Sequence, residues 1–266
     1  MELHSAYGVS LPEKNWIPAP RYLMRRNRIL NLLQEITPGS WLEIGCGAGA
    51  LLFDLSQKGF SCSILEHSPH ALTLVDAVRK EYGFALDIYT QPQNIPSELF
   101  DYIGAFEVLE HIEDDTTALC QWLQWLRKDG LLFLSVPAHM RQRTATDTWA
   151  GHYRRYEKKQ LVETLEAAGL EIERCECYGF PLANMIAPFR SRMHAAEMAR
   201  DNQEGNDHKR DSATTQSGTN RKTETRMYPL LKSLPGRLIM DMAFRIQTLF
   251  LNMDLGNGYL VVARKK

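Results

Sequence analysis

The sequence predicts an α/β protein built on a doubly wound, parallel sheet. Short apolar segments of strand length alternate with amphipathic segments of helix length, and this alternation is typical of helices that cross between parallel strands. A glycine-rich turn at residues 45–49 follows the first apolar segment and precedes an amphipathic one. The chain has 266 residues, 44% of them hydrophobic, which is enough to bury a full core as one domain with an appendage.

Residues 1–39 are expected to form an N-terminal cap segment. Prolines at positions 12, 18 and 20 predict irregular structure over residues 1–20. From Arg21 to Ile36, apolar residues interleave with arginines. This stretch is therefore predicted to be an amphipathic helix, which Pro38-Gly39 ends.

Residues 40–180 are expected to form the core, with six strands and four helices. The strands are predicted at Leu42–Ile44, Cys62–Glu66, Phe84–Tyr89, Tyr102–Phe106, Leu131–Val136 and Leu170–Cys177. The helices are predicted at Ala50–Lys58, from Ser68 to about Lys80, from Asp114 to Arg127 and at Gln160–Ala168. A final strand is expected at Tyr259–Ala263, within residues 257–266.

Residues 181–256 separate the last two strands and are expected to be a helical insertion. Within it, residues 201–226 contain no large apolar side chain, so this loop is predicted to be disordered. The flanks, Phe180–Arg200 and Tyr228–Phe250, are rich in Leu, Met, Ile and Phe. They are expected to be helices that either pack on the sheet edge or, as the family resemblance given below implies, cover an apolar substrate, which methionine suits because it adapts its shape.

Composition excludes several classes of protein. The net charge of −1 predicts no overall attraction to nucleic acid or to an anionic membrane. The five cysteines, at 46, 62, 120, 175 and 177, show no Cys-x-x-Cys spacing, which favours a reduced, cytoplasmic protein without a cysteine–zinc site. No secretory leader and no apolar run of about 20 residues is recognisable.

Glu43 indicates which cofactor the glycine turn binds. Such a turn places a nucleotide-like ligand against the amides at a helix N-terminus, and with Ala50 it also fits a dinucleotide fingerprint. A carboxylate two residues before Gly45 would repel a pyrophosphate, whereas it would attract the cationic ammonium and sulfonium of S-adenosylmethionine. The bland alternative is a strand–turn–helix without a ligand.

The string Leu42-Glu43-Ile44-Gly45-Cys46-Gly47-Ala48-Gly49 resembles the first motif of class I S-adenosylmethionine-dependent methyltransferases. The resemblance implies a Rossmann-like, seven-stranded sheet whose last strand runs antiparallel beside the sixth. Independently of it, Glu66 at the end of the second strand is placed to accept hydrogen bonds from both ribose hydroxyls. The cofactor-binding residues expected from the turn, Glu66 and the resemblance are Glu43, Gly45, Cys46, Gly47, Gly49, Glu66, His67, Gln93, Asn94 and Glu107.

The segment Glu107-x-x-Glu110-His111 has two interpretations. In one, Glu107 borders the cofactor while Glu110 and His111 brace the loop or face the acceptor. In the other, the side chains converge on one side of a helical turn and hold a divalent cation. This second arrangement resembles ubiquinone-pathway O-methyltransferases and small-RNA 2′-O-methyltransferases, and the latter resemblance adds His152 as a ligand.

A polar stretch after the fifth strand is expected to face the acceptor, because ligands bind at the carboxyl ends of strands in open α/β sheets. It runs from His139 through Asp147 to Gly151-His152-Tyr153-Arg154-Arg155-Tyr156 and resembles bacterial methyltransferases that occur with surface-glycan or lipid genes. His111, His139 and His152 are candidate proton acceptors for a hydroxyl, with Asp147 as an orienting partner. Arg154 and Arg155 either hold an anionic group of the acceptor or face solvent.

The resulting hypothesis is an S-adenosylmethionine-dependent methyltransferase that O-methylates a small-molecule, lipid or glycan intermediate. Trp16, Tyr22 and Arg26 are expected to close the cofactor site, and residues 228–255 offer a peripheral contact with a membrane. The alternatives are a metal-assisted RNA 2′-O-methyltransferase and a non-catalytic or dinucleotide-binding protein with the same sheet.

Overall fold

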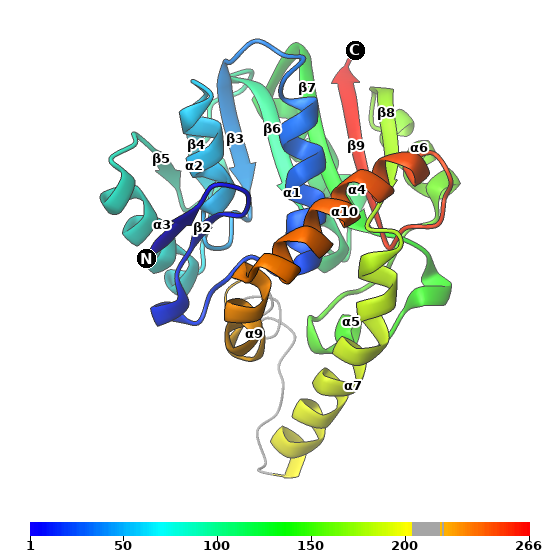
Figure 1. Ribbon diagram of the computed structural model, residues 1–266. Coiled ribbons are helices and arrows are strands. Elements are labelled where there is room, and N and C mark those ends of the chain that lie inside the picture. Colours follow the sequence, from blue (N-terminus) through cyan, green and yellow to red (C-terminus); the bar gives the residue numbers. More distant parts are fainter. Residues whose placement is uncertain (204–218, 220) are drawn as a thin grey trace.

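The computed structural model describes residues 1–203, 219 and 221–266 (Figure 1). Its centre is a seven-stranded sheet in the order β5-β4-β3-β6-β7-β9-β8. The strands are β3 (Ser40–Ile44), β4 (Ser61–Leu65), β5 (Asp87–Tyr89), β6 (Phe100–Phe106), β7 (Leu126–Pro137), β8 (Leu170–Tyr178) and β9 (Gly258–Lys265). The first five are parallel, while β9 runs antiparallel to both β7 and β8. The predicted sheet is confirmed, including its antiparallel last strand.

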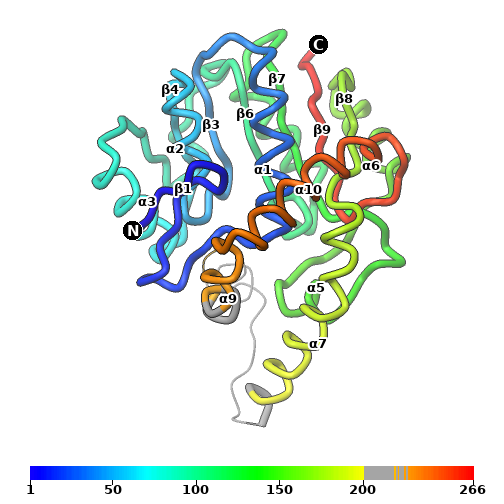
Figure 2. Tube along the Cα trace, in the orientation of Figure 1, coloured from blue at the N-terminus to red at the C-terminus, as the bar shows by residue number. Residues whose placement is uncertain are grey.

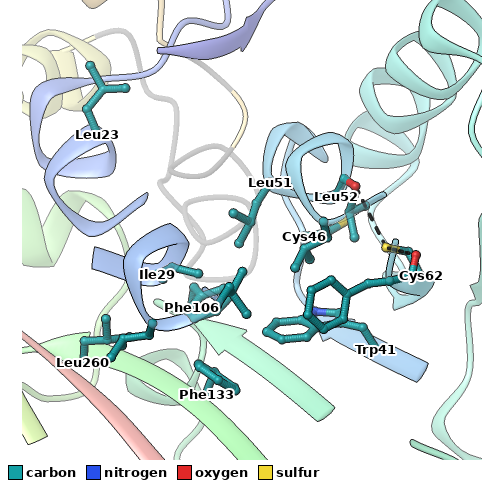
Figure 3. Packing of buried hydrophobic residues seen from close by; sticks show 14 of the residues in the cluster. Leu23, Ile29, Trp41, Cys46, Leu51, Leu52, Cys62, Phe106, Phe133 and Leu260 are labelled. Carbon is teal, nitrogen blue, oxygen red and sulfur yellow. Dashed lines mark hydrogen bonds between the residues drawn. The ribbon is translucent and has the colours of Figure 1, made fainter. Parts of the chain in front are cut away.

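Alternating residues of the strands build two apolar layers, one on each face of the sheet. On β7, Leu131 and Phe133 belong to one layer and Leu132 and Leu134 to the other. The first layer is covered by α1 (Pro20–Leu32), α2 (Ala50–Gln57) and α10 (Leu234–Phe250), and the second by α4 (Asp115–Trp125) and α6 (Lys158–Ala167). Figure 3 shows Trp41 and Phe133 of the sheet packing with Ile29 of α1 and Leu51 of α2.

Local signals fix several helix ends as the sequence predicts. In α3 (Pro69–Tyr82), Ser68 Oγ accepts a hydrogen bond from the Ala71 amide at 3.3 Å, and Gly83 ends the helix in the left-handed conformation. Asp114 caps α4 by accepting from the Thr117 amide at 3.0 Å. The caps at Ser68 and Asp114 lie at the edge of the sheet where the cavity described below opens.

Three predictions of local structure are wrong. Residues 1–20 are not irregular throughout, because β1 (Glu2–His4) and β2 (Gly8–Ser10) form a hairpin with Val9 buried against α2. The third strand begins at Asp87 rather than Phe84, since this edge strand pairs with β4 over three residues only. The fifth strand begins at Leu126 rather than Leu131, because Leu126 already pairs with Phe100. The preceding helix, α4, is therefore shorter than predicted.

The segment before β9 contains α7 (Leu182–Gln203), α9 (Lys222–Lys232) and α10. Figure 2 follows the chain from β8 into α7 and, through α9 and α10, back to β9. Most of the loop predicted to be disordered, 201–226, lies outside the described residues, and its edges form the end of α7 and the start of α9. The division into cap, core and insertion stays a prediction. No described helix is long and apolar enough to span a membrane.

Candidate active site

A cavity of about 940 Å³ opens beside the carboxyl ends of β3, β4 and β6, where ligands bind in sheets of this kind. Its floor is the glycine turn after β3, and α1 lies along one wall. The short helix α5 (Ala145–Trp149) contributes to the opposite wall through Thr146 and Trp149. The volume lies within the range of small-molecule pockets.

The glycine turn requires its glycines. Gly45, Gly47 and Gly49 have φ of +65°, +57° and +71°, in the region where residues with a Cβ are strained. A Cβ on Gly45 would lie 2.7 Å from Cγ2 of Val108. Gly45, Cys46 and Gly47 line the cavity, whereas Gly49 caps α2. The turn therefore brings bare backbone to the ligand.

Glu43 lies in the cavity wall with its carboxylate buried. The side chain sits on β3, the residue is 4% exposed, and Oε2 has no hydrogen-bond partner among the described residues. Burial raises the pKa of Glu43 to about 8, and Asp54 and Glu66 add to the effect while Arg25 opposes it. A buried acceptor without a partner is costly, so this oxygen is suited to a cationic donor on a ligand.

Glu66 lies at the adjacent strand end. Its Oε1 accepts from the amides of His67 and Ser68 at 3.0 and 2.8 Å, which fixes the carboxylate at the cavity edge. His67 is exposed and also lines the cavity. Gln93 and Asn94 are exposed and do not contribute to the wall, to which their loop supplies only Pro92. Their contact with the cofactor stays a prediction.

Glu107 is held by four neighbours. Arg21 donates from Nη1 to Oε2, while Ser135 and Tyr178 donate hydroxyl protons to Oε1 at 3.2 and 3.0 Å. Arg25 Nη1 lies 3.5 Å from Oε1. Burial alone would raise the pKa of Glu107, but the two arginines outweigh it and lower the pKa to about 2. Glu107 is therefore an anion at the cavity edge.

Glu110, His111 and His152 come together beyond Glu107. One potential ligand atom from each lies within 4.8 Å of the others, and His152 Nε2 is 3.9 Å from Glu110 Oε1. Glu110 is fully buried, and neither carboxylate oxygen has a hydrogen-bond partner in the described chain. Burial and the charge of Glu107 raise the pKa of Glu110 well above its ordinary range, whereas burial and His152 lower the pKa of His111 to about 3.

Asp147 orients His152. Its Oδ1 lies 3.0 Å from His152 Nδ1 and accepts a hydrogen bond from Arg155 Nε at 2.7 Å. Its Oδ2 accepts a hydrogen bond from the Thr144 amide at 2.7 Å, and this bond is part of the capping box that begins α5. Burial would raise the pKa of Asp147, but the hydrogen bonds from His152 and Arg155 hold it below its usual range. With Nδ1–H donated to Asp147, the ring presents an unprotonated Nε2 toward Glu110.

The third candidate histidine lies elsewhere. His139 is 2% exposed, does not line the cavity, and contacts Glu157 and Tyr259 on the far side of β7 from His152. Arg154 and Arg155 are also committed, the first to Asp115 at 2.7 Å and the second to Asp147. Arg26 lines the cavity beside Trp16 and Tyr22, yet its guanidinium binds both oxygens of Asp54 at 2.6 Å.

Sequence reasoning missed Arg21 and Thr146, whereas Trp149 belongs to the polar stretch that was expected to face the acceptor. Arg21 begins the predicted helix next to Tyr22, but nothing local indicates that it reaches Glu107. The capping box Thr144-x-x-Asp147 was a recognisable helix start, and it would have indicated that Thr146 and Trp149 lie on a helix.

A model of a family described as "Methyltransferase domain" matches residues 19–174, which include the whole glycine turn and the Asp147–His152 pair. The chain belongs to this family, the class I S-adenosylmethionine-dependent methyltransferases. Membership decides for S-adenosylmethionine as the methyl donor over a dinucleotide.

Similar proteins share the fold at low identity. The methyltransferase is 22% identical to the ubiquinone biosynthesis O-methyltransferase of Rickettsia canadensis over 117 residues, which is 43% of this chain and 50% of that protein. It is 25% identical to a probable S-adenosylmethionine-dependent methyltransferase of Mycolicibacterium smegmatis over 160 residues, 57% of this chain and 60% of that one. The chain thus spans about half the length of these relatives. A putative sarcosine dimethylglycine methyltransferase from Galdieria sulphuraria superposes with a TM-score of 0.57 at 12% identity, covering 100% of this chain and 94% of that one, which shows the fold alone.

The cavity fits the methyl donor. Gly45 and Gly47 line the cavity without side chains and leave room for the donor, and the unpartnered Oε2 of Glu43 can accept a hydrogen bond from its ammonium group. Glu66 at the next strand end is placed for the ribose hydroxyls.

Proposed function

We propose that this methyltransferase O-methylates a small-molecule, lipid or glycan intermediate and that His152 accepts the hydroxyl proton. The observation that carries the proposal is the Asp147–His152 pair in the cavity wall, joined at 3.0 Å. A histidine oriented through Nδ1 keeps Nε2 available as a general base. A neutral amine acceptor already has a reactive lone pair on nitrogen. It therefore has less need of a general base such as the Asp147–His152 pair.

S-adenosylmethionine, when bound, supplies an electrophilic methyl carbon on a sulfonium that leaves as a neutral thioether. The acceptor oxygen would take up this methyl group as the carbon–sulfur bond breaks, and His152 Nε2 would accept the hydroxyl proton. Asp147 stabilises the imidazolium because its carboxylate stays ionised. Much of the acceleration comes from holding the acceptor in line in a cavity that excludes water.

The acceptor wall favours an apolar or aromatic molecule. Phe106, Ile112, Trp122 and Trp149 line the cavity together with His152, and the Trp149 ring stacks on His194 at 4.1 Å, which rigidifies it. Aromatic side chains provide large contact areas with little flexibility. These walls support a hydroxylated ring or lipid-like acceptor in preference to a free sugar.

A lipid surface is also supported. Exposed apolar side chains gather on α7, α9, α10 and the segment after it, at Met185, Phe189, Met227, Leu230, Leu234, Leu238, Ile239, Met242, Leu249, Met253 and Leu255. We call this set the apolar face. Residues 182–200 and 227–255, which carry it, hold six Lys or Arg against three Asp or Glu. Apolar side chains with a cationic excess favour contact with an anionic membrane, so we propose that the enzyme meets its acceptor there.

A methyl-transfer assay tests the proposal. The purified chain is incubated with S-adenosylmethionine and matched phenol, aliphatic alcohol and amine acceptors, and the products are identified by mass spectrometry. We expect methyl ethers from hydroxyl acceptors, and we expect His152→Gln to bind S-adenosylhomocysteine yet produce none. Amine products formed equally by wild type and His152→Gln would contradict it.

Metal-assisted transfer is the second candidate, and the cluster of Glu110, His111 and His152 favours it. Asp147 behind His152 matches the carboxylate–histidine pairs found at metal sites, and neither oxygen of Glu110 has a hydrogen-bond partner among the described residues. The three residues would hold a divalent cation, which would supply Lewis-acid stabilisation of the acceptor oxygen. Glu107 is excluded from the predicted ligand set because Arg21 and Tyr178 occupy its oxygens.

A chelator experiment separates the two. Activity lost in chelator, restored by Mg²⁺, Mn²⁺ or Zn²⁺ and absent in Glu110→Gln would support the metal, and activity unchanged by chelator would refute it. RNA 2′-O-methylation would require the same metal and a single-stranded RNA acceptor in the panel. The near-neutral charge of the chain argues for the smaller acceptors.

A further inference from the structure

A second group of potential metal ligands lies outside the cavity, on the other side of β7. It consists of His139, just after β7, Cys177 on β8 and Asp254, in the loop between α10 and β9. One ligand atom from each lies within 4.8 Å of the others, and His139 Nε2 is 3.7 Å from Asp254 Oδ1. The three residues are far apart in the sequence and meet only because β9 inserts between β7 and β8.

His139 points an unsatisfied atom into this group. Its side chain is 3% exposed, and Nε2 is buried without a hydrogen-bond partner among the described residues. The other ring nitrogen, Nδ1, lies 3.4 Å from both Glu157 Oε2 and the Tyr259 hydroxyl. A carboxylate that binds Nδ1–H leaves a lone pair on Nε2, and this arrangement is usual for histidines that bind metals.

Cys177 and Asp254, the other two potential ligands, also have hydrogen-bond partners outside the group. Burial and the charge of Asp254 raise the pKa of Cys177 to about 12 in the metal-free protein, and a backbone hydrogen bond from Gly256 to the sulfur opposes this effect. The Tyr259 hydroxyl donates to Asp254 Oδ1 at 2.6 Å and so fixes the carboxylate. Glu157 is itself fixed, because its Oε1 accepts from the Met140 amide at 2.9 Å. Each potential ligand therefore has a supporting partner.

A path from solvent leads to the group. A shallow surface hollow is lined by Glu157, Lys158, Glu163 and Asp254, among others, while His139 and Cys177 form the buried side of the group. Asp254 is 48% exposed through its side chain. A cation can enter from the hollow and keep a solvent molecule there.

We propose that His139, Cys177 and Asp254 bind Zn²⁺. One thiolate, one imidazole and one carboxylate form a mixed donor set that suits zinc and disfavours Mg²⁺ or Ca²⁺, which require oxygen ligands. The metal links the end of β7 and β8 to the loop that leads from α10 into β9. It therefore fixes the point where the chain returns from the apolar face to the sheet, and it lies outside the methyl-transfer site. The proposal is independent of the proposed function.

Cobalt substitution tests the site, because a sulfur ligand gives a signature that the cavity cluster lacks. The full chain is stripped with chelator and titrated with Co²⁺. We expect a thiolate-to-cobalt charge-transfer band together with the visible bands of a tetrahedral site, which Zn²⁺ then displaces stoichiometrically. Glu110→Gln, which alters only the cavity cluster, should leave both bands unchanged.

Variants of the proposed ligands and their neighbours test the assignment further. Cys177→Ser should abolish the charge-transfer band and weaken Zn²⁺ affinity by more than the 10–100-fold typical of losing an outer partner, and Glu157→Gln should weaken it by about tenfold. Cys175→Ser, on the same strand, should change nothing. If Cys177→Ser does not fold, Asp254→Asn at the exposed ligand should keep the band and lower the affinity. Absence of the band in wild type, or equal Zn²⁺ affinity in Cys177→Ser or Asp254→Asn and wild type, overturns the proposal.

Discussion

The donor side and the acceptor side of the cavity are built in different ways. On the donor side, Glu43, the glycine turn and Glu66 lie within residues 43–66, on two neighbouring parallel strands. On the acceptor side, Arg21, the pair Glu107 and Glu110, and His152 come from three separate segments that meet only in the folded chain. The shape of the donor side depends on backbone geometry. The shape of the acceptor side depends on ion pairs and hydrogen bonds between charged side chains.

This difference predicts how each side fails when it is altered. A side chain added in the glycine turn fills space that the cofactor needs, and no neighbouring residue can move to restore that space. A change on the acceptor side breaks a network that has several members, so the cofactor still binds while the chemistry stops. Substitutions in the two sides should therefore separate binding from catalysis.

The largest effect on cofactor binding is expected from Gly45→Ala. The added Cβ would lie 2.7 Å from Val108 Cγ2, at a φ of +65°, so we expect S-adenosylhomocysteine to bind roughly 100-fold or more weakly, equivalent to about 3 kcal/mol. Calorimetric titration measures the change. The matched control is Gly83→Ala, because Gly83 has a φ of +68° and no atom within 4 Å of an added Cβ. If both variants lost affinity equally, backbone strain and not the cradle would be the cause.

The same difference explains what the sequence could predict. Glu43, Gly45 and Glu66 were recognisable because a strand, a tight turn and a helix are adjacent in the chain, and their spacing is itself the signal. The pairing of Arg21 with Glu107 and the approach of Glu110 to His152 depend on how distant loops pack. The sequence could supply Glu107, Glu110 and His152 only as candidates, and it did not indicate Arg21 at all.

The prediction of no cysteine–zinc site was based on the absence of a local pattern, and the zinc site proposed above would run against it. No Cys-x-x-Cys spacing exists, yet Cys177 lies beside His139 and Asp254. Cys175 and Cys177 are two residues apart and lie on the same face of β8, so their positions along the strand determine which of them lies beside the group. The strand order, with β9 in the middle, was needed before that could be known.

On the acceptor side, His152→Gln should lower kcat by about 10²–10⁴-fold, as expected for loss of a general base. The affinity for S-adenosylhomocysteine should not change, because His152 lies away from the glycine turn. Steady-state rates and calorimetry measure the two quantities. His70→Gln, at an exposed position of α3, is the control, and a His152→Gln enzyme with wild-type kcat would rule out the base.

On the donor side, Glu43 predicts a pH dependence of binding. Its pKa of about 8 in the unliganded protein means that the carboxyl is protonated at neutral pH, whereas a cationic ligand favours the carboxylate. S-adenosylmethionine affinity should therefore rise with pH, by up to about tenfold per unit below pH 8, as a proton is released.

Glu43→Gln should lose this dependence and keep only the titration of the ligand's own amino group. Stability supplies a second check: an acid whose folded pKa is raised destabilises the fold as pH rises from its unfolded value toward 8. The unliganded variant should therefore lose less thermal stability over that range than wild type. Glu81→Gln, at an exposed position of α3, should behave as wild type in both measurements, and a flat wild-type profile would contradict the role of Glu43.

The smallest expected effect concerns the apolar face. Met240, Ala243 and Gln247 of α10 are buried, and Gln247 Nε2 donates to the Met24 carbonyl of α1 at 3.2 Å. Leu234, Leu238 and Met242, on the opposite side of the same helix, are 70%, 61% and 56% exposed. A helix that is apolar on both sides requires a second apolar environment, and the cationic excess around it favours an anionic lipid surface.

Leu238→Glu should weaken sedimentation with phosphatidylglycerol vesicles roughly three- to tenfold, because a leucine only partly enters the headgroup layer. Leu3→Glu, at a residue of β1 that is 53% exposed, should have no effect. Equal losses in the two variants would show that added charge, and not the apolar face, governs binding to the vesicles.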